Sequence, residues 1–239
     1  MDERKRIIIS MVIKLIIIVC FITGFSLSFL YGHVNGVTNL LYFTQQSNLW
    51  IALMDLVMVV FIIRALVRKE YKLPSILYRL LQVFTLCITI TGLVYCFILI
   101  PGFYLSDVVK PDGYTPFNTA AVLLHMVIPT LAVIDFLMFT RNVEFKKYDF
   151  LLALAPSAYY FIFSLIGFLL NWDFGDGRNY PYFFINYASP AGIFGFSSEM
   201  PYFMGSFYWI VILSGMIVGL SYLYIWLIRK IMAKANKAA

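Results

Sequence analysis

Residues 118–139 read NTAAVLLHMVIPTLAVIDFLMF, and this stretch decides the fold. As an α-helix it is long enough and apolar enough to cross the hydrocarbon core of a bilayer, which is about 30 Å thick. It nevertheless carries His125, Pro129 and Asp135. Ionisable side chains inside a membrane are costly and normally face protein or water. The stretch therefore predicts a membrane span and makes His125 a candidate functional residue.

The composition extends this interpretation to the whole chain. Of the 239 residues, 62% are hydrophobic and 13% are charged, about half the charged fraction of an ordinary soluble domain. We expect an all-α fold, a single domain over residues 1–239 that forms a polytopic membrane protein with six transmembrane helices. The predicted helices are residues 7–30, 48–67, 75–100, 118–139, 150–170 and 205–228.

The basic residues predict the orientation of these helices. Most of the 18 Lys and Arg residues flank the spans on the side that holds both termini, and basic residues near helix ends are retained in the cytoplasm. Lys110 and Arg178 fall on the other side. We therefore expect a multi-pass protein of the cell membrane with its N-terminus and C-terminus in the cytoplasm. The basic runs are not interleaved with aromatic side chains, so no nucleic-acid partner is predicted, and no protein partner is indicated.

The sequence predicts no metal and no cofactor. Cys20, Cys87 and Cys96 lie in apolar segments without a Cys-x-x-Cys motif, so neither a disulfide framework nor a zinc site is indicated. A metal site would need His33 and His125, the only two histidines, together with a carboxylate such as Asp107. No ligand-spacing motif supports that combination.

Three charged residues inside the predicted spans form a structural ion pair in the simplest interpretation. Lys14 and Asp55 approach the middle of the membrane from opposite sides, and a rise of about 1.5 Å per residue brings them within reach of each other. Asp135 is the competing partner, although it lies close enough to the end of its helix to reach water. The same three residues support an alternative function, a small-solute or ion transporter coupled through Lys14, Asp55 and Asp135.

Thr44 and His125 form a candidate catalytic pair. A neutral histidine in a dry site is a competent base for an alcohol nucleophile. Structural alternatives exist for both, since Thr44 could cap the second helix and His125 could simply bond a polar group of another helix. If the second helix begins near Asn48, Thr44 lies at the surface and His125 about 10 Å deeper, so residues 36–47 would have to dip inward.

Two further features concern packing. Residues 171–204 form the longest loop and are rich in Tyr, Phe and Gly, which is typical either of an aromatic belt at the membrane interface or of a lid over a binding cavity. In the last predicted helix, Gly215 and Gly219 form a small-xxx-small pair. We expect this pair to pack against a neighbouring helix of the same chain.

The chain resembles the androgen-induced and androgen-dependent-regulator type of six-helix membrane proteins and their bacterial relatives. The residues that carry the resemblance are Thr44 in FTQQSN (43–48), His125 in LHMVIP (124–129), Asp135 ten residues later, and YPYF at 180–183. Animal members of that family are intramembrane threonine hydrolases that cleave fatty acid esters of hydroxy fatty acids. In them the Asn follows the Thr after two residues and the Pro stands five after the His, whereas both intervals are four here.

The resemblance implies that Thr44 is the nucleophile and His125 its base, in a bacterial plasma membrane. The expected substrate is a lipid ester that enters laterally from the membrane lipids. Candidates for binding the oxyanion or the substrate are Asn48, Ser47, Asn118, Tyr180 and Tyr182. Asp55 and Asp135 lie about 15 Å or more along their helices from Thr44 and His125, so we expect a dyad without a carboxylate.

Overall fold

The computed structural model describes residues 2–32, 34, 36–105, 115–141 and 143–237, with side chains described as far as Lys234. His33, Asp107 and Lys110, which entered the sequence predictions, lie outside the described residues. Within the described residues the regular secondary structure is helical, apart from an isolated β-bridge between Phe196 and Met204.

The predicted all-α fold with six spans is confirmed, because six helices are long and apolar enough to cross a membrane. The chain is therefore a multi-pass membrane protein. Three of the spans combine several labelled elements. In order, the elements are α1 (Glu3–Tyr31), α2 (Phe43–Arg68), α3 (Ser75–Val94) continuing through a π-helical turn (Tyr95–Leu99) into α4 (Ile100–Leu105), α5 (Thr119–Val122) continuing through a second π-helical turn (Leu123–Val127) into α6 (Ile128–Phe139), α7 (Asp149–Leu152) followed by α8 (Leu154–Leu169), and α9 (Ser206–Lys237).

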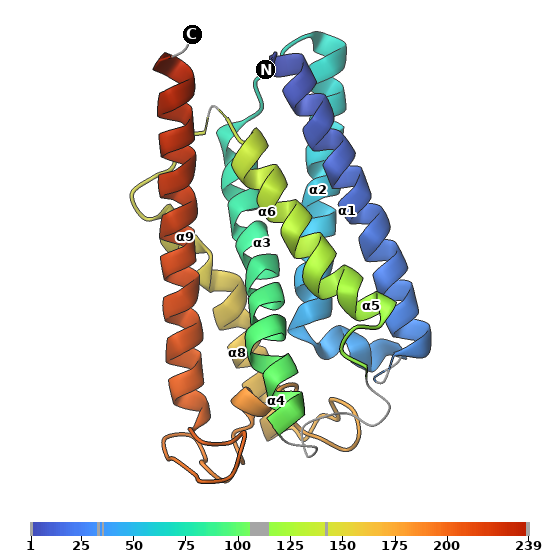
Figure 1. The fold of residues 1–239 in the computed structure, drawn as a ribbon, viewed down its shortest axis with the longest axis vertical. Coiled ribbons are helices and arrows are strands. Elements are labelled where there is room, and N and C mark those ends of the chain that lie inside the picture. The colour runs from blue at the N-terminus through green and yellow to red at the C-terminus, as the bar shows by residue number, and fades with distance from the viewer. Residues whose placement is uncertain (1, 33, 35, 106–114, 142, 238–239) are drawn as a thin grey trace.

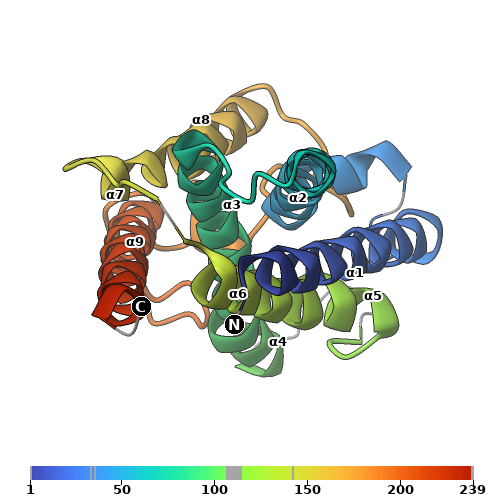
Figure 2. The ribbon, with the colours of Figure 1, turned by 90° about the horizontal axis from the view of Figure 1, so that it is seen from above.

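The helices run along the long axis of the molecule, and both termini lie at the same end (Figure 1). We call the opposite end the distal end; it is formed by residues 36–42, by α4 and by residues 171–205, including short 3-10 helices at Gly36–Leu41 and Phe183–Ile185. Seen from above, α3 lies at the centre of the bundle (Figure 2). It packs against α2, α6 and α9, while α1 packs against α2 and α6.

A buried cluster of charges ties three of these helices together. Lys14 Nζ of α1 lies 3.0 Å from Asp55 Oδ1 of α2 and 2.5 Å from Asp135 Oδ2 of α6. Ser10 Oγ donates a further hydrogen bond to Asp135 Oδ1 at 2.6 Å. Lys14 has no exposed surface and Asp135 is 2% exposed. The position of Asp135 near the helix end had left open that it reaches water. It is instead buried, and both Asp135 and Asp55 bond to Lys14.

The prediction for Gly215 and Gly219 is wrong. A Cβ atom built at either glycine meets no described atom within 4 Å, so the pair does not pack against another helix of the chain. Instead α9 is held to α3 by polar side chains, because Gln82 Nε2 donates to Ser221 Oγ at 2.9 Å and the hydroxyls of Thr89 and Tyr224 lie 3.1 Å apart.

We expect Lys14→Met to destabilise the protein strongly. Removing the ammonium leaves two carboxylates buried without their cation, and breaking a buried ion pair in this way costs about 3–5 kcal/mol. The measurement is thermal unfolding in detergent, with Lys72→Met, at an exposed loop position, as the matched control. Equal melting temperatures for the two variants would contradict the structural role given to the cluster.

Candidate functional site

The site lies where the two π-helical turns face each other near the distal end. The ring of Tyr95, in the first turn, stacks on the imidazole of His125, in the second, with centroids 3.7 Å apart and planes 17° apart. Each turn is followed two residues later by a proline, Pro101 or Pro129. Because proline has no N–H, it disrupts the regular hydrogen-bond pattern of the preceding turn, and π-helical turns occur frequently at functional sites.

Thr44 and His125 come together at this place. Thr44 Oγ1 lies 3.3 Å from His125 Nε2, and His125 Nδ1 lies 3.0 Å from the carbonyl oxygen of Ala121. A carbonyl can only accept, so Nδ1 carries the proton. In the neutral imidazole, Nε2 then presents its lone pair to the threonine hydroxyl.

The predicted difference in depth between the two residues is wrong. It assumed a helix starting near Asn48, but α2 begins at Phe43, so Thr44 lies in its first turn. Thr44 is also not the helix cap, because Tyr42 occupies that position and makes no side-chain cap bond. The first turn of α2 therefore brings Thr44 to the level of His125 without an inward-dipping loop.

Asn48 positions the pair. Its Nδ2 donates to the carbonyl of Thr44 at 2.8 Å and to the carbonyl of Leu124 at 3.1 Å. The Leu124 carbonyl has no donor within its own helix. The N–H of Ile128, which would bond to it in an α-helix, bonds to the Leu123 carbonyl instead. Residue 129, the donor expected in a π-helix, is a proline without an N–H. Both amide hydrogens of Asn48 are thus given to carbonyls, which differs from the oxyanion-binding role predicted from the sequence.

Ser47 and Asn118 also have structural partners. Ser47 is fully buried and its Oγ lies 2.7 Å from Thr91 Oγ1 of α3, so it joins two helices and lines neither of the cavities described below. Asn118 caps α5, since its Oδ1 accepts from the N–H of Ala121 at 2.8 Å. Asn118 nevertheless lines the wider of the two cavities described below, so it can contact a ligand there.

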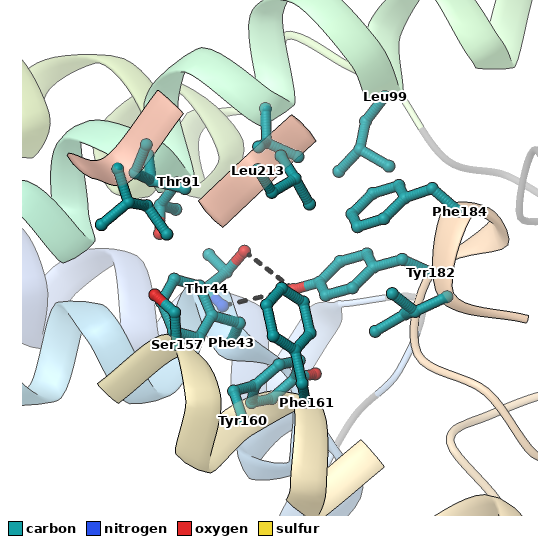
Figure 3. A pocket seen from close by; sticks show the side chains of 14 residues that line it. Phe43, Thr44, Thr91, Leu99, Ser157, Tyr160, Phe161, Tyr182, Phe184 and Leu213 are labelled. Carbon is teal, nitrogen blue, oxygen red and sulfur yellow. Dashed lines mark hydrogen bonds between the residues drawn. The ribbon is translucent and has the colours of Figure 1, made fainter. Parts of the chain in front are cut away.

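Tyr182 contacts the candidate nucleophile directly. Its hydroxyl lies 3.3 Å from the backbone nitrogen of Thr44 and 3.4 Å from Thr44 Oγ1 (Figure 3). The ring is held edge-on by Tyr42 and parallel to Phe184. Burial raises the pKa of Tyr182, so its hydroxyl keeps its proton and remains a donor. Tyr180, two residues before Tyr182, has its hydroxyl 3.3 Å from that of Tyr202.

Two cavities meet at Thr44. The wider cavity, about 580 Å³, opens at the distal end and contains both Thr44 and His125 in its wall. The narrower cavity, about 50 Å³, is lined mainly by apolar side chains of α3, α8 and α9 (Figure 3). Thr44, Leu99 and Tyr182 line both cavities, so these three residues form the partition between them.

The aromatic loop of residues 171–204 has a buried part and an exposed part. Residues 180–183 line the wider cavity, and Phe183 and Phe184 are buried, which is the arrangement expected of a lid. Phe194 and Phe196 are exposed, at 66% and 71%, which is typical of aromatic side chains at a membrane interface. The loop therefore has a buried part that lines the cavity and an exposed aromatic part, and the choice between a lid and an interfacial belt stays a prediction.

The described residues contain no group of three or more His, Cys, Asp or Glu side chains that could hold a metal ion. His33 and Asp107, which the sequence offered as partners of His125 in such a site, lie outside the described residues.

Sequence reasoning missed the role of Tyr95 and the close approach of α3 to the His125 turn. A Cβ atom at Gly92 would lie 2.9 Å from the backbone oxygen of His125 and 3.1 Å from Pro129 Cβ. Gly92 is thus what lets α3 come close enough for Tyr95 to stack on the imidazole. A glycine three residues before an aromatic residue was the available signal, but it is too common to single out.

Comparison with known proteins gives no match to a family model, to a characterised protein or to a solved structure.

We expect Gly92→Ala to destabilise the protein by about 1–3 kcal/mol, because the added methyl group must push α3 away from the His125 turn. Gly215→Ala is the matched control, since its methyl group meets nothing within 4 Å and alanine favours the helix. Thermal unfolding in detergent distinguishes the two. If Gly92→Ala melted at or above the Gly215→Ala temperature, the close approach of α3 would be refuted.

Proposed function

We propose that this protein is an intramembrane hydrolase of lipid esters, with Thr44 as nucleophile and His125 as its base. The observation that carries the proposal is the 3.3 Å approach of Thr44 Oγ1 to His125 Nε2, with the other ring nitrogen on the Ala121 carbonyl. A hydroxyl beside a base that is itself oriented by a third group is the arrangement of an activated nucleophile.

The reaction proceeds in two halves. His125 Nε2 takes the proton of Thr44 Oγ1 as the oxygen attacks the ester carbonyl, and the resulting imidazolium returns that proton to the departing alkoxide. This leaves an acyl ester on Thr44. A water molecule then attacks the acyl carbon, giving its proton to Nε2, and the collapse of the second tetrahedral intermediate releases the fatty acid and restores the proton to Thr44.

Tyr182 and the start of α2 stabilise the oxyanion. The hydroxyl of Tyr182 and the backbone N–H of Thr44 both lie next to Thr44 Oγ1, and the N-terminus of a helix carries partial positive charge. In the free protein these two groups bond to each other. When an oxyanion forms beside them, both can donate to it, which is the geometry such catalysis requires.

The imidazole is oriented without a carboxylate. Ala121 fixes its tautomer through the bond to Nδ1, and Tyr95 fixes its plane by stacking. Tyr95 is fixed in turn, because its hydroxyl donates to the carbonyl of Pro116. Asp55 and Asp135 serve the Lys14 cluster instead.

The resemblance to the androgen-induced type of threonine hydrolases supports the same assignment and points to fatty acid esters of hydroxy fatty acids as the substrate class. The basic residues support cytoplasmic termini, which puts the distal end and its cavities toward the outer leaflet of a bacterial plasma membrane. A lipid ester then reaches Thr44 laterally from that leaflet. No cofactor is needed for this chemistry.

A second candidate, a small-solute or ion transporter, rests on the buried cluster of Lys14, Asp55 and Asp135. Asp55 Oδ2 is buried and has no hydrogen-bond partner among the described residues, which leaves one site for a proton or cation. Buried charges inside a membrane often mark ion pathways. Function that is lost in Asp55→Asn but retained in Thr44→Ala would favour this candidate.

The hydrolase is tested with a fluorophosphonate probe on membranes containing the protein. We expect wild type to be labelled, Thr44→Ser to retain partial labelling, and Thr44→Ala and His125→Ala to lose at least nine tenths of it, because the first lacks the attacking oxygen and the second its base. Thr130→Ala, at an exposed position, is the matched control and should label like wild type. Undiminished labelling of Thr44→Ala would remove the nucleophile assignment.

A further inference from the structure

Arg6 is buried at the end of the bundle that holds both termini, which we call the terminal end. It lies near the start of α1 and is 8% exposed. Its ion pair with Glu3 is loose, since Arg6 Nη2 lies 3.8 Å from Glu3 Oε1 and the Glu3 side chain is 54% exposed. Arg6 Nε is buried and has no hydrogen-bond partner among the described residues. Because a buried donor of a charged group is costly without an acceptor, Arg6 is suited to bind an anion.

Another arginine of the terminal end shows what a fully paired guanidinium group looks like in this fold. Arg79 of α3 donates from Nε to Asp149 Oδ2 at 2.6 Å and from Nη2 to Asp149 Oδ1 at 2.5 Å. Asp149 is buried, so this pair of parallel bonds satisfies the arginine inside the protein. Among the described residues Arg6 pairs only with Glu3, at a distance too long for a hydrogen bond. The two arginines therefore differ in what they leave for a ligand.

The end of α6 brings a second arginine to the level of Arg6. Helices α1 and α6 run in opposite directions (Figure 1) and are joined by the bond from Ser10 to Asp135. Arg6 lies about 6 Å from Ser10 toward the terminal end, by helical rise. Thr140 lies about 7.5 Å from Asp135 in the same direction, and Arg141 follows it. Burial and, after it, the positive charge of Arg6 lower the pKa of Arg141, as expected of neighbouring guanidinium groups.

Two hydroxyl groups lie at the same level. Thr140 is buried, and its Oγ1 has no hydrogen-bond partner among the described residues. Tyr78, near the start of α3, is buried too, and its hydroxyl lies within electrostatic range of both Arg6 and Arg141. Arg141 donates from Nη1 to the Thr140 carbonyl at 2.6 Å, a bond that uses one of its five N–H donors. Three helix ends thus supply two cations and two hydroxyl donors.

We propose that Arg6 and Arg141, with the hydroxyls of Thr140 and Tyr78, bind the phosphate group of an anionic membrane lipid. A guanidinium group matches two phosphate oxygens with parallel hydrogen bonds. A phosphate has further oxygens to accept from hydroxyl groups, which a carboxylate bound by two arginines does not. The bound lipid joins the ends of α1, α3 and α6 and gives the buried Arg6 its anion.

The position of the cluster favours a lipid as the source of the phosphate. Ile9 and Val12 lie within two turns of Arg6 and are exposed, so apolar surface for acyl chains begins next to the cluster. The basic residues predict that the terminal end faces the cytoplasm, and basic sites between helices on that side bind the headgroups of anionic lipids. A zwitterionic headgroup would add its own cation beside two guanidinium groups, so phosphatidylglycerol fits better than phosphatidylcholine.

The test measures lipid binding to the purified protein in a non-ionic detergent. Native mass spectrometry counts bound phosphatidylglycerol and phosphatidylcholine, and thermal unfolding at increasing lipid concentration gives their affinities. We expect wild type to bind phosphatidylglycerol about tenfold more tightly than phosphatidylcholine, in line with charge-assisted hydrogen bonds. Arg6→Gln and Arg141→Gln should each lose this preference, and Arg6→Lys should keep part of it. Arg4→Gln removes the same charge at an exposed position and is the matched control.

The result does not depend on the proposed hydrolase, because no ester is cleaved. An unchanged preference in both glutamine variants overturns the site, and so does an equal loss in Arg4→Gln, which would reduce the effect to general surface charge. Stabilisation of wild type by inorganic phosphate as strong as that by phosphatidylglycerol overturns the lipid as the source of the phosphate. If Arg6→Gln does not fold, Arg141→Gln, which alters a half-buried residue, decides alone.

Discussion

The hydrogen bonds from the Asn48 amide to the carbonyls of Thr44 and Leu124 set the register on which the candidate site depends. Pro129 has no N–H, and in the π-helical turn the Ile128 N–H bonds to the Leu123 carbonyl. The Leu124 carbonyl therefore has no donor in its own helix and accepts from Asn48 instead. A carbonyl without a donor is costly in a membrane interior, so α2 and the His125 turn are fixed in this register. One amide thereby sets where the threonine hydroxyl meets the imidazole.

The same constraint organises the rest of the bundle. Lys14 can be buried only because Asp55 and Asp135 reach it from two other helices, and α9 is joined to α3 through Gln82 and Thr89. Specific polar contacts thus join α1 to α2 and α6, and α3 to α9. The proposed chemistry occupies the distal end, where the helix ends leave room for cavities that closely packed helices would not allow.

The sequence predicted the parts of this structure that depend on local composition. Six apolar runs predicted six helices, and the polar residues within them nominated Thr44, His125 and the Lys14 cluster. It could not predict that α2 starts at Phe43, because that start depends on contacts with Tyr182 and Tyr160 from distant segments.

Other features depend on tertiary contacts in the same way. The role of Asn48 follows from a carbonyl that Pro129 leaves without a helical partner, and Tyr95 meets His125 only because Gly92 lets two helices approach. The prediction that Gly215 and Gly219 pack against another helix was wrong because a glycine allows a close approach of helices but does not cause one.

The central claim is that Thr44 Oγ1 attacks an ester with His125 as its base. The most direct measurement is mass spectrometry of the purified protein after incubation with a lipid ester and rapid acid quenching, which traps an acyl group still bound to the chain. The account predicts an acyl adduct on the peptide that contains Thr44 and its absence when His125 is replaced by alanine. Turnover of the ester with no acyl group on that peptide, or with the acyl group on another residue, would contradict it.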